Sequence, residues 1–178
     1  TLVLLDGSEL LIKDLEDNDH IIDITSLNGF IIEPGVNLIF SGNVNISGRV
    51  DLPVDCNYKL LDNSVFSIAD GCKLNLNSSS VFEIGKNAQI SIQDKGLLSA
   101  NEVTLTSCET WKGILAEIGS ILNLSNSTIN NADYAINGSP VTLTIRNCTF
   151  TDCENGISLV ECNDFTFENN TLNGVGIG

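Results

Sequence analysis

An alternating apolar segment that recurs at a nearly constant interval in the second half of the chain limits the fold more than any other feature of the sequence. Its pattern is L-x-L-x-N with other apolar residues in place of some Leu, and its three copies begin at Leu122, Leu143 and Phe165. Two more apolar columns keep the same phase. They comprise Ile129, Phe150 and Leu172, and Ile114, Ile136 and Ile157, each of the last three following Gly or Ala. Because so many columns stay in phase, the segments are copies of one structural unit.

A related pattern, F-x-I-x-x-G-x-x-L, occurs in the first half of the chain. Its copies begin at Phe30, Phe66 and Phe82, and in the last copy Asn87 replaces the Gly. Apolar residues at every second position predict strands with one buried face. Gly and Asn both tolerate the left-handed backbone of a tight turn, so each copy is predicted to fold as strand, turn, strand.

A unit of roughly 20 residues made of short strands cannot bury its own apolar face, so it must stack on its neighbours. Helical repeats need longer units of about 33 to 47 residues, and the L-x-x-L-x-L spacing of leucine-rich repeats is absent. The sequence therefore predicts an all-β chain folded as a parallel β-helix. Equivalent residues of successive coils lie about 4.8 Å apart in such a fold. We therefore expect Asn126, Asn147 and Asn169 to form a ladder of buried, mutually bonded amides.

The charge of the chain excludes some partners. The chain has eight Lys and Arg residues and 23 Asp and Glu residues, which gives a net charge of −15. Such a surface repels nucleic-acid phosphates and anionic lipid headgroups, so no nucleic-acid partner is expected. No apolar run reaches the roughly 18 to 20 residues of a membrane helix, so no membrane insertion is expected either.

Three segments carry a resemblance to a known family: residues 31–40 (IIEPGVNLIF), the turn at Trp111–Ile114, and the Asn-x-x-Phe/Leu coils. They resemble the right-handed parallel β-helix proteins of the pectate-lyase-like superfamily, with the closest similarity to secreted, surface-displayed proteins of the Bacteroidetes type. The resemblance implies a right-handed β-helix in a secreted or cell-surface protein. It implies less about activity, because this superfamily carries lyases, hydrolases, epimerases, adhesins and scaffolds on one architecture.

Residues 30–178 are predicted to form the coils, seven or eight in number, because the apolar columns keep phase from Phe30 to Leu172. Residues 1–29 are less regular and include an acidic run at residues 14–19. They are predicted to form an N-terminal cap with a few irregular strands. The run from Asn173 to Gly178 ends within a coil, so the chain is expected to be truncated at its C-terminal end.

Few residues are suited to catalysis. His20 is the only histidine, so any Ser-His-Asp or Cys-His arrangement would depend on it. The resemblance implies an Arg or Lys base for the lyases of the superfamily and paired Asp for its hydrolases. The only arginines are Arg49 and Arg146, and Arg146 is expected to form a structural ion pair with Glu168 in the next coil. No catalytic residue is therefore assigned, and the balance favours a protein that is not an enzyme.

Four oxygen-bearing side chains in adjacent coils form a candidate calcium site. Asp133 and Glu154 occupy one outward column, and Asn131 and Asp152 occupy another two residues earlier. Ca²⁺ takes six to eight oxygen ligands, some from the backbone or water, so calcium is the candidate cofactor and no other is expected. The alternatives are a solvated acidic face and the carboxylate pair of a glycosidase.

The cysteines and the tryptophan are expected to be structural. The six cysteines lack the C-x-x-C spacing of zinc sites, so mostly free, buried thiols are expected. A disulfide between Cys148 and Cys153 is the alternative. Trp111 is expected to pack over the coil edge instead of stacking on a sugar.

Ice binding would require a flat Thr-x-Thr ladder on successive coils. Thr104 and Thr106 begin such a pattern. Aligning Leu105 with Ile145, however, places Thr106 over Arg146, so the second threonine column is interrupted. Ice binding is therefore not expected.

The function expected from the sequence is a non-catalytic, secreted or cell-surface β-helix segment that acts as a scaffold, an adhesin or a glycan-contact surface. Its expected partner is a polysaccharide or a cell-surface glycan. The alternative is part of a carbohydrate-active enzyme, a polysaccharide lyase or a glycoside hydrolase, whose catalytic groups lie partly outside this chain.

Overall fold

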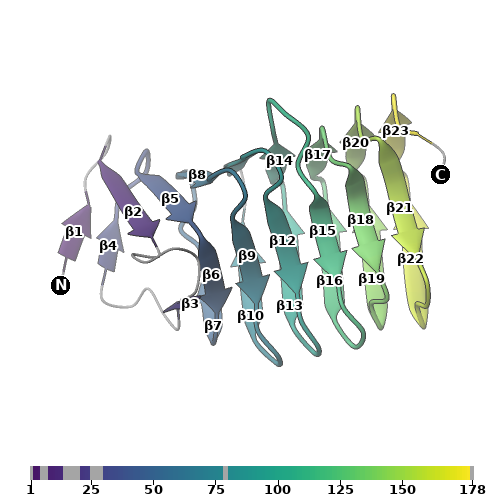
Figure 1. Ribbon diagram of the computed structural model, residues 1–178, viewed down its shortest axis with the longest axis horizontal. Coiled ribbons are helices and arrows are strands. Elements are labelled where there is room, and N and C mark those ends of the chain that lie inside the picture. The colour runs from purple at the N-terminus through teal and green to yellow at the C-terminus, as the bar shows by residue number, and fades with distance from the viewer. Residues whose placement is uncertain (1, 5–7, 14–20, 25–29, 78–79, 177–178) are drawn as a thin grey trace.

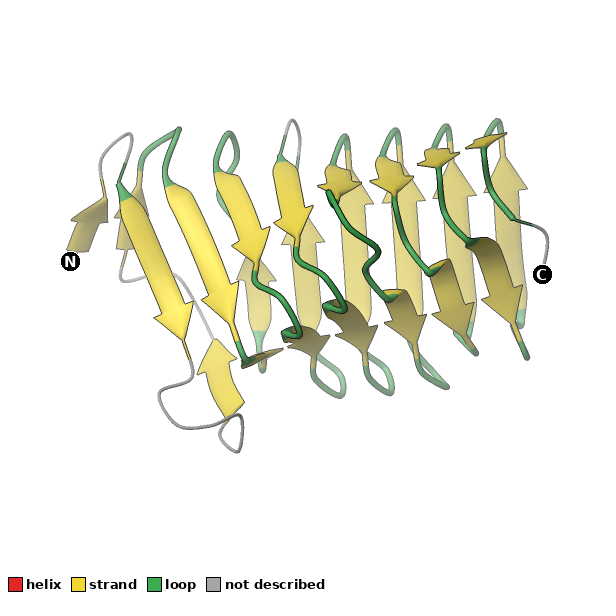
Figure 2. Cartoon of the chain, turned by 45° about the horizontal axis from the view of Figure 1, so that its top comes forward, coloured by secondary structure: helices red, strands yellow, loops and turns green. Residues whose placement is uncertain are grey.

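The computed structural model describes residues 2–4, 8–13, 21–24, 30–77 and 80–176, and every regular element among them is a β-strand. The chain winds as a solenoid in which each turn adds one strand to each of three parallel sheets (Figures 1 and 2). This arrangement confirms the predicted all-β parallel β-helix. The described residues contain no helix, and so none that is long and apolar enough to cross a membrane.

The three sheets contain eight, seven and six strands. The eight-stranded sheet consists of β2 (Glu9–Lys13), β5 (Asn37–Ser41), β8 (Asn57–Leu60), β11 (Val81–Ile84), β14 (Thr104–Thr106), β17 (Thr128–Asn130), β20 (Thr149–Thr151) and β23 (Thr171–Asn173). The seven-stranded sheet consists of β3 (Ile21–Ile24), β6 (Asn43–Ile46), β9 (Val65–Ile68), β12 (Gln89–Ile92), β15 (Gly113–Ala116), β18 (Tyr134–Gly138) and β21 (Asn155–Leu159). The six-stranded sheet consists of β7 (Arg49–Asp51), β10 (Lys73–Leu76), β13 (Leu97–Asn101), β16 (Ile121–Ser125), β19 (Thr142–Arg146) and β22 (Asp164–Glu168). A separate pair joins β1 (Leu2–Leu4) to β4 (Phe30–Ile32).

The described strands complete about six turns, fewer than the seven or eight expected. The count follows the six-stranded sheet, because the eight-stranded and seven-stranded sheets extend beyond it, and the turns themselves are unequal in length. Lys73, Leu97 and Ile121 are register partners on successive strands, and the intervals between them are equal. The next partners, Thr142 and Asp164, follow at shorter intervals.

The first-half pattern folds as strand, turn, strand, as predicted, but its copies are not equivalent coils. Phe66 lies on β9 of the seven-stranded sheet, whereas Phe82 lies on β11 of the eight-stranded sheet. The chain passes through only one other strand, β10, between them, so the two residues are separated by less than a full turn. All the same, their rings meet in the core, where Phe40 and Phe66 pack edge to face and Tyr58 stacks on Phe82.

The columns predicted in the second half are confirmed by the register of the strands. Leu122 pairs with Leu143, which pairs with Phe165, on three neighbouring strands of the six-stranded sheet. The two other columns stack in the same way: Ile129, Phe150 and Leu172, and Ile114, Ile136 and Ile157. The alternating pattern thus places the apolar side chains of all but the last turn in one continuous core, whereas Phe165 and Leu172 on the last turn are exposed.

The predicted asparagines lie at the corner between the six-stranded and eight-stranded sheets, but of their described side chains only those of Asn126 and Asn147 are bonded to each other, and the column is exposed rather than buried. Asn126, Asn147 and Asn169 all have positive φ, between 50° and 54°. Asn147 Nδ2 donates to Asn126 Oδ1 at 3.2 Å on the protein surface. The burial prediction was wrong because the residues after Asn126 and Asn147 turn inward instead; Ser127 and Cys148 take the buried position.

Trp111 and the cysteines behave as structural residues. Trp111 is fully buried, and its Nε1 donates to the backbone oxygen of Asn130 at 2.9 Å. All six thiols are free, so the alternative disulfide between Cys148 and Cys153 does not form. The buried thiols are Cys56, Cys148 and Cys153, and burial raises the pKa of all three. Cys108 is exposed, so the expectation of burial holds for only part of the set.

The region predicted to be a cap contributes strands where it is described. β2 pairs in parallel with β5, with Leu10 opposite Leu38 and Ile12 opposite Phe40, so it extends the eight-stranded sheet. The acidic run at residues 14–19 and His20 lie outside the described residues.

Candidate functional site

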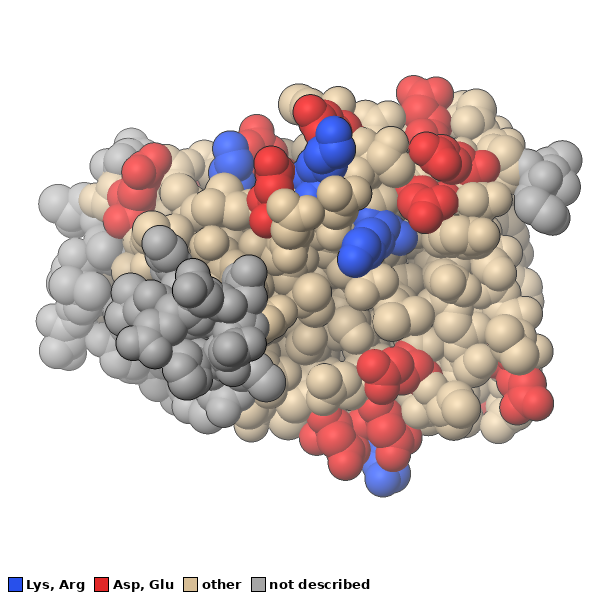
Figure 3. Space-filling model, in the orientation of Figure 1, with Lys and Arg blue, Asp and Glu red and all other residues tan. Residues whose placement is uncertain are grey.

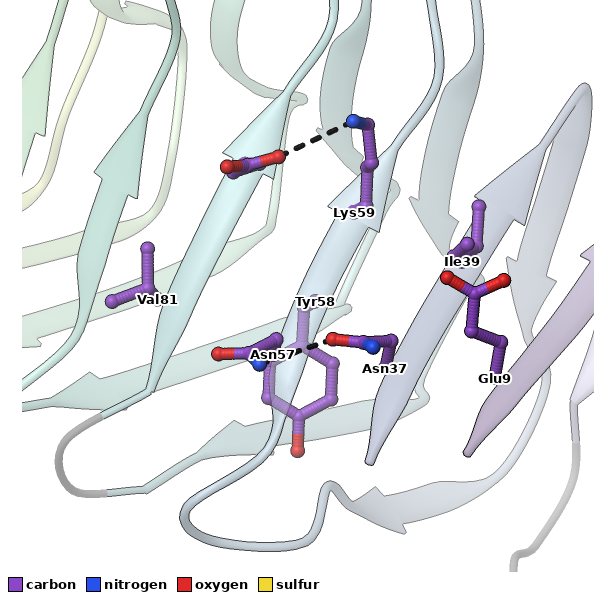
Figure 4. A pocket seen from close by; sticks show the side chains of 8 residues that line it. Glu9, Asn37, Ile39, Asn57, Tyr58, Lys59 and Val81 are labelled. Atoms are coloured by element: carbon purple, nitrogen blue, oxygen red, sulfur yellow. Dashed lines mark hydrogen bonds and ion pairs between the residues drawn. The ribbon is translucent and has the colours of Figure 1, made fainter. Parts of the chain in front are cut away.

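The outward face of the eight-stranded sheet carries a groove of about 410 Å³ that crosses β2, β5, β8 and β11 (Figure 4). Residues from four successive turns line it because parallel strands bring equivalent positions side by side. The lining residues are Glu9, Asn37, Ile39, Asn57, Tyr58, Lys59, Val81 and Glu83.

Two lateral interactions order the floor of this groove, and both are drawn in Figure 4. Asn57 Nδ2 donates to Asn37 Oδ1 at 3.0 Å, which links two neighbouring strands through their amides. Lys59 Nζ lies 3.3 Å from Glu83 Oε2 on the next strand. The groove therefore offers amide donors and acceptors beside a lysine whose charge is already paired.

A second hollow of about 380 Å³ adjoins the first and shares Lys59 and Glu83 with it. It lies over the edge of the sheet, where the chain leaves β8, β11 and β14, and the remaining residues that line it are Asp62, Ile84, Gly85, Lys86, Thr106, Ser107, Cys108 and Glu109. Lys86 Nζ lies 3.0 Å from Glu109 Oε2, and this carboxylate raises the pKa of Lys86. We call the two adjoining hollows together the polar groove.

From β14 to β23 the same face of the sheet carries hydroxyl and amide side chains only, beginning with Thr106, which also lines the polar groove. Thr104, Thr128, Thr149 and Thr171 form one column, and Thr106, Asn130, Thr151 and Asn173 form the other. This register corrects the alignment made from the sequence, because Leu105 pairs with Ile129 and not with Ile145. The first threonine column is therefore unbroken, and the second alternates Thr with Asn. We call these eight residues the Thr/Asn array.

The outward face of the seven-stranded sheet is largely uncharged as well. One column runs from Asn45 to Ser158, and its intervening members are Ser67, Ser91, Leu115 and Asn137. Figure 3 shows that charged side chains gather mostly along the margins of this face. Between Asn45 and Ser158 this column carries no charged side chain, and on β3 the register partner of Asn45 is Asp23.

The residues of the predicted calcium site lie at the corner between the eight-stranded and seven-stranded sheets. Asp133 and Glu154 are neighbours in one column, because Tyr134 pairs with Asn155 immediately after them. Asn155 Nδ2 also donates to the Asp133 carboxylate at 3.4 Å.

The other two members, Asn131 and Asp152, are neighbours in a second column and both have positive φ, 54° and 52°. The side chain of Asn131 donates to the backbone oxygen of Ser107. Within the described residues, no three His, Cys, Asp or Glu side chains are placed to share a metal ion. Calcium binding at Asp133, Glu154, Asn131 and Asp152, completed by backbone or water oxygens, stays a prediction.

Both arginines pair with carboxylates on the six-stranded sheet. Arg146 Nε lies 3.0 Å from Glu168 Oε2, which confirms the expected ion pair. Arg49 Nε lies 3.9 Å from Asp51 Oδ2. These pairs are exposed and lie on a different sheet from the polar groove.

The polar groove was not predicted from the sequence, because its residues belong to turns of unequal length. Asn37, Asn57 and Val81 are register partners, yet the interval from the first to the second is shorter than the interval from the second to the third. The outward residues of this column are unevenly spaced in the sequence, and no residue type is common to all of them. They therefore produce no repeat that can be recognised from the sequence. Only the inward partners, such as Leu38 and Tyr58, carry the repeat.

The comparisons with known proteins bear on the class of the fold. A model of the family described as "Rhamnogalacturonase A/epimerase, pectate lyase-like" matches residues 30–178. Neither the search of curated proteins nor the search of solved structures found a match.

Proposed function

Because this chain belongs to the rhamnogalacturonase A/epimerase, pectate lyase-like family, we propose that it is a non-catalytic β-helix that contacts glycans through the polar groove. The family match indicates a carbohydrate-related β-helix. The proposal adds that the protein is secreted or displayed at the cell surface, where polysaccharides are accessible, and that it serves as a scaffold or adhesin.

The observation that carries this proposal is the extended polar surface of the eight-stranded sheet. The amides of Asn37 and Asn57 lie side by side in the groove, and the Thr/Asn array continues across four further strands. Amides and hydroxyls both donate and accept hydrogen bonds, as sugar hydroxyls do. Ile39 and the exposed Val81 add apolar surface against which the C–H face of a sugar ring can pack. A long, shallow groove of this kind suits a polymer rather than a small metabolite.

A binding role fits the charges better than a catalytic one. A lyase needs an unpaired Lys or Arg to remove a proton, but Lys59 and Lys86 are each held by a carboxylate about one hydrogen-bond length away. Both arginines are likewise paired, and they lie outside the groove. The paired lysines therefore support a groove that holds a glycan without the free base that a lyase needs.

The proposal is tested by affinity electrophoresis through gels that contain individual polysaccharides, with a reducing-sugar and unsaturated-product assay run on the same samples. We expect at least one polysaccharide to retard the protein and none to be cleaved. The double variant Lys59→Gln/Glu83→Gln removes one ion pair from the groove and should weaken retardation at least fivefold.

The matched control is Arg146→Gln/Glu168→Gln, which removes an exposed ion pair of the same kind from the six-stranded sheet. It should be retarded like the parent. Equal loss in both variants would contradict the assignment of the groove. Release of sugar products by the parent would contradict the non-catalytic role and favour the alternative of a carbohydrate-active enzyme.

A further inference from the structure

We infer that the glycan held by the polar groove is an uncharged polysaccharide and not a polyuronate, an inference that rests on the proposed function and specifies its ligand. Three features support it: the charges that line the groove, the pairing of its two lysines and the composition of the surface beyond it.

The lining of the polar groove carries more negative than positive charge. Four carboxylates face two ammonium groups among the residues that line it: Glu9, Asp62, Glu83 and Glu109 against Lys59 and Lys86. A polyuronate carries one negative charge on every sugar unit. Charges closer than the screening length of about 8 Å at physiological salt act on one another, so such a polymer is repelled where it lies against these carboxylates.

Neither lysine is free to reverse this repulsion. Lys59 Nζ lies 3.3 Å from Glu83, and Lys86 Nζ lies 3.0 Å from Glu109. A uronate carboxylate that approached either ammonium group would also approach the protein carboxylate already paired with it. The two ion pairs therefore act as neutral, polar parts of the surface.

The surface that continues from the groove is uncharged. The Thr/Asn array presents hydroxyl and amide groups on β14, β17, β20 and β23, at the spacing of about 4.8 Å between neighbouring strands. β-branched threonine side chains lose little rotamer freedom when they are held in place. A neutral polysaccharide lying across the strands would meet a hydrogen-bonding group on each strand and no charge.

The test compares retardation by a neutral β-galactan or β-glucan with retardation by polygalacturonate, in EDTA so that calcium does not bridge carboxylates. We expect retention by at least one neutral polymer, little changed between 50 mM and 500 mM salt. Retention by polygalacturonate should be at least tenfold weaker at 50 mM salt.

A charge variant makes the test specific to the groove. Glu83→Gln/Glu109→Gln frees Lys59 and Lys86, and it should raise retention by polygalacturonate at least fivefold at 50 mM salt. The control Asp51→Asn/Glu168→Gln makes the same change in net charge by freeing Arg49 and Arg146 on the six-stranded sheet, and it should show no gain. Each variant is normalised to its own mobility in a gel without polysaccharide.

The outcomes separate the two proposals. Strong retention of the parent protein by polygalacturonate would overturn the choice of ligand and leave the glycan-binding role intact. An equal gain in the control variant would also overturn it, because the gain would then follow net charge and not the groove. Retention by no polysaccharide of either kind would overturn the proposed function itself.

Discussion

Asn147 separates two explanations of why asparagines recur at one corner of this solenoid. The residue has φ of 53°, and its side-chain amide donates to Asn126 at 3.2 Å on an exposed surface. Asn at this position is explained either by the left-handed backbone, which Asn tolerates, or by the hydrogen bond between the two side-chain amides. Replacing Asn147 by Ala removes both the amide and the tolerance of positive φ, whereas replacing it by Gly removes only the amide.

The magnitudes favour the backbone. A left-handed conformation costs an ordinary L-residue roughly 1 to 2 kcal/mol, while a typical hydrogen bond contributes about 0.5 to 1.5 kcal/mol, and an exposed bond lies at the low end because water replaces it. Asn147→Ala should therefore lower the free energy of unfolding by about 1.5 kcal/mol. Asn147→Gly should stay within about 0.5 kcal/mol of the parent, since Gly adopts positive φ without strain.

Urea unfolding followed by circular dichroism measures both changes, provided that the slope of free energy against urea is unchanged. Asn123→Ala is the control, because Asn123 lies in extended backbone on β16, where the loss of a partly exposed side chain should cost less than about 0.5 kcal/mol. If Gly and Ala at position 147 destabilise the protein equally, the amide ladder and not the backbone is responsible, and our reasoning is refuted.

Four further predictions concern packing, thiol reactivity, the pH dependence of stability, and calcium. Gly113 has φ of 92°, and an added Cβ would overlap the backbone oxygen of Tyr134. Gly113→Ala should therefore lower the free energy of unfolding by more than about 3 kcal/mol or leave the protein insoluble. A melting curve like that of the parent would contradict this prediction. A thiol reagent should modify Cys108 quickly in the folded protein and the three buried thiols only on unfolding. Burial raises the pKa of those three thiols, so their contribution to stability is complete below the ordinary thiol pKa and falls as the pH rises through the alkaline range. A melting temperature that increases over that alkaline range would contradict this prediction. If calcium binds at the predicted site, it should raise the melting temperature of the parent but not of the variant Asp133→Asn/Glu154→Gln. An equal rise in both proteins would contradict calcium binding at this site.

Inward residues made the fold predictable, and outward residues did not. Leu122, Leu143 and Phe165 keep a nearly even spacing because they are register partners on successive turns, where Leu122 and Leu143 fill the core and Phe165 lies at its exposed end. Outward positions face solvent and tolerate many residue types. The sequence alignment therefore placed Thr104 beside the wrong strand, and nothing in the sequence indicated that Lys59 pairs with Glu83.

Local conformation also limited what could be read from the sequence. The left-handed turns at Asn126 and Asn147 were predicted as a ladder, because Asn both tolerates that backbone and stacks well. Their exposure was not predicted, since it depends on the next residue turning inward at the corner. The first-half pattern misled in a similar way, because Phe66 and Phe82 share a local motif but lie on different sheets.

A crystal structure of the protein with a neutral oligosaccharide tests the central claim most directly. We predict an intact sugar chain that crosses β5, β8 and β11, with hydrogen bonds to the amides of Asn37 and Asn57 and with the Lys59–Glu83 ion pair still in place. An oligosaccharide bound to the seven-stranded or six-stranded sheet, or a cleaved product in the groove, would contradict the account.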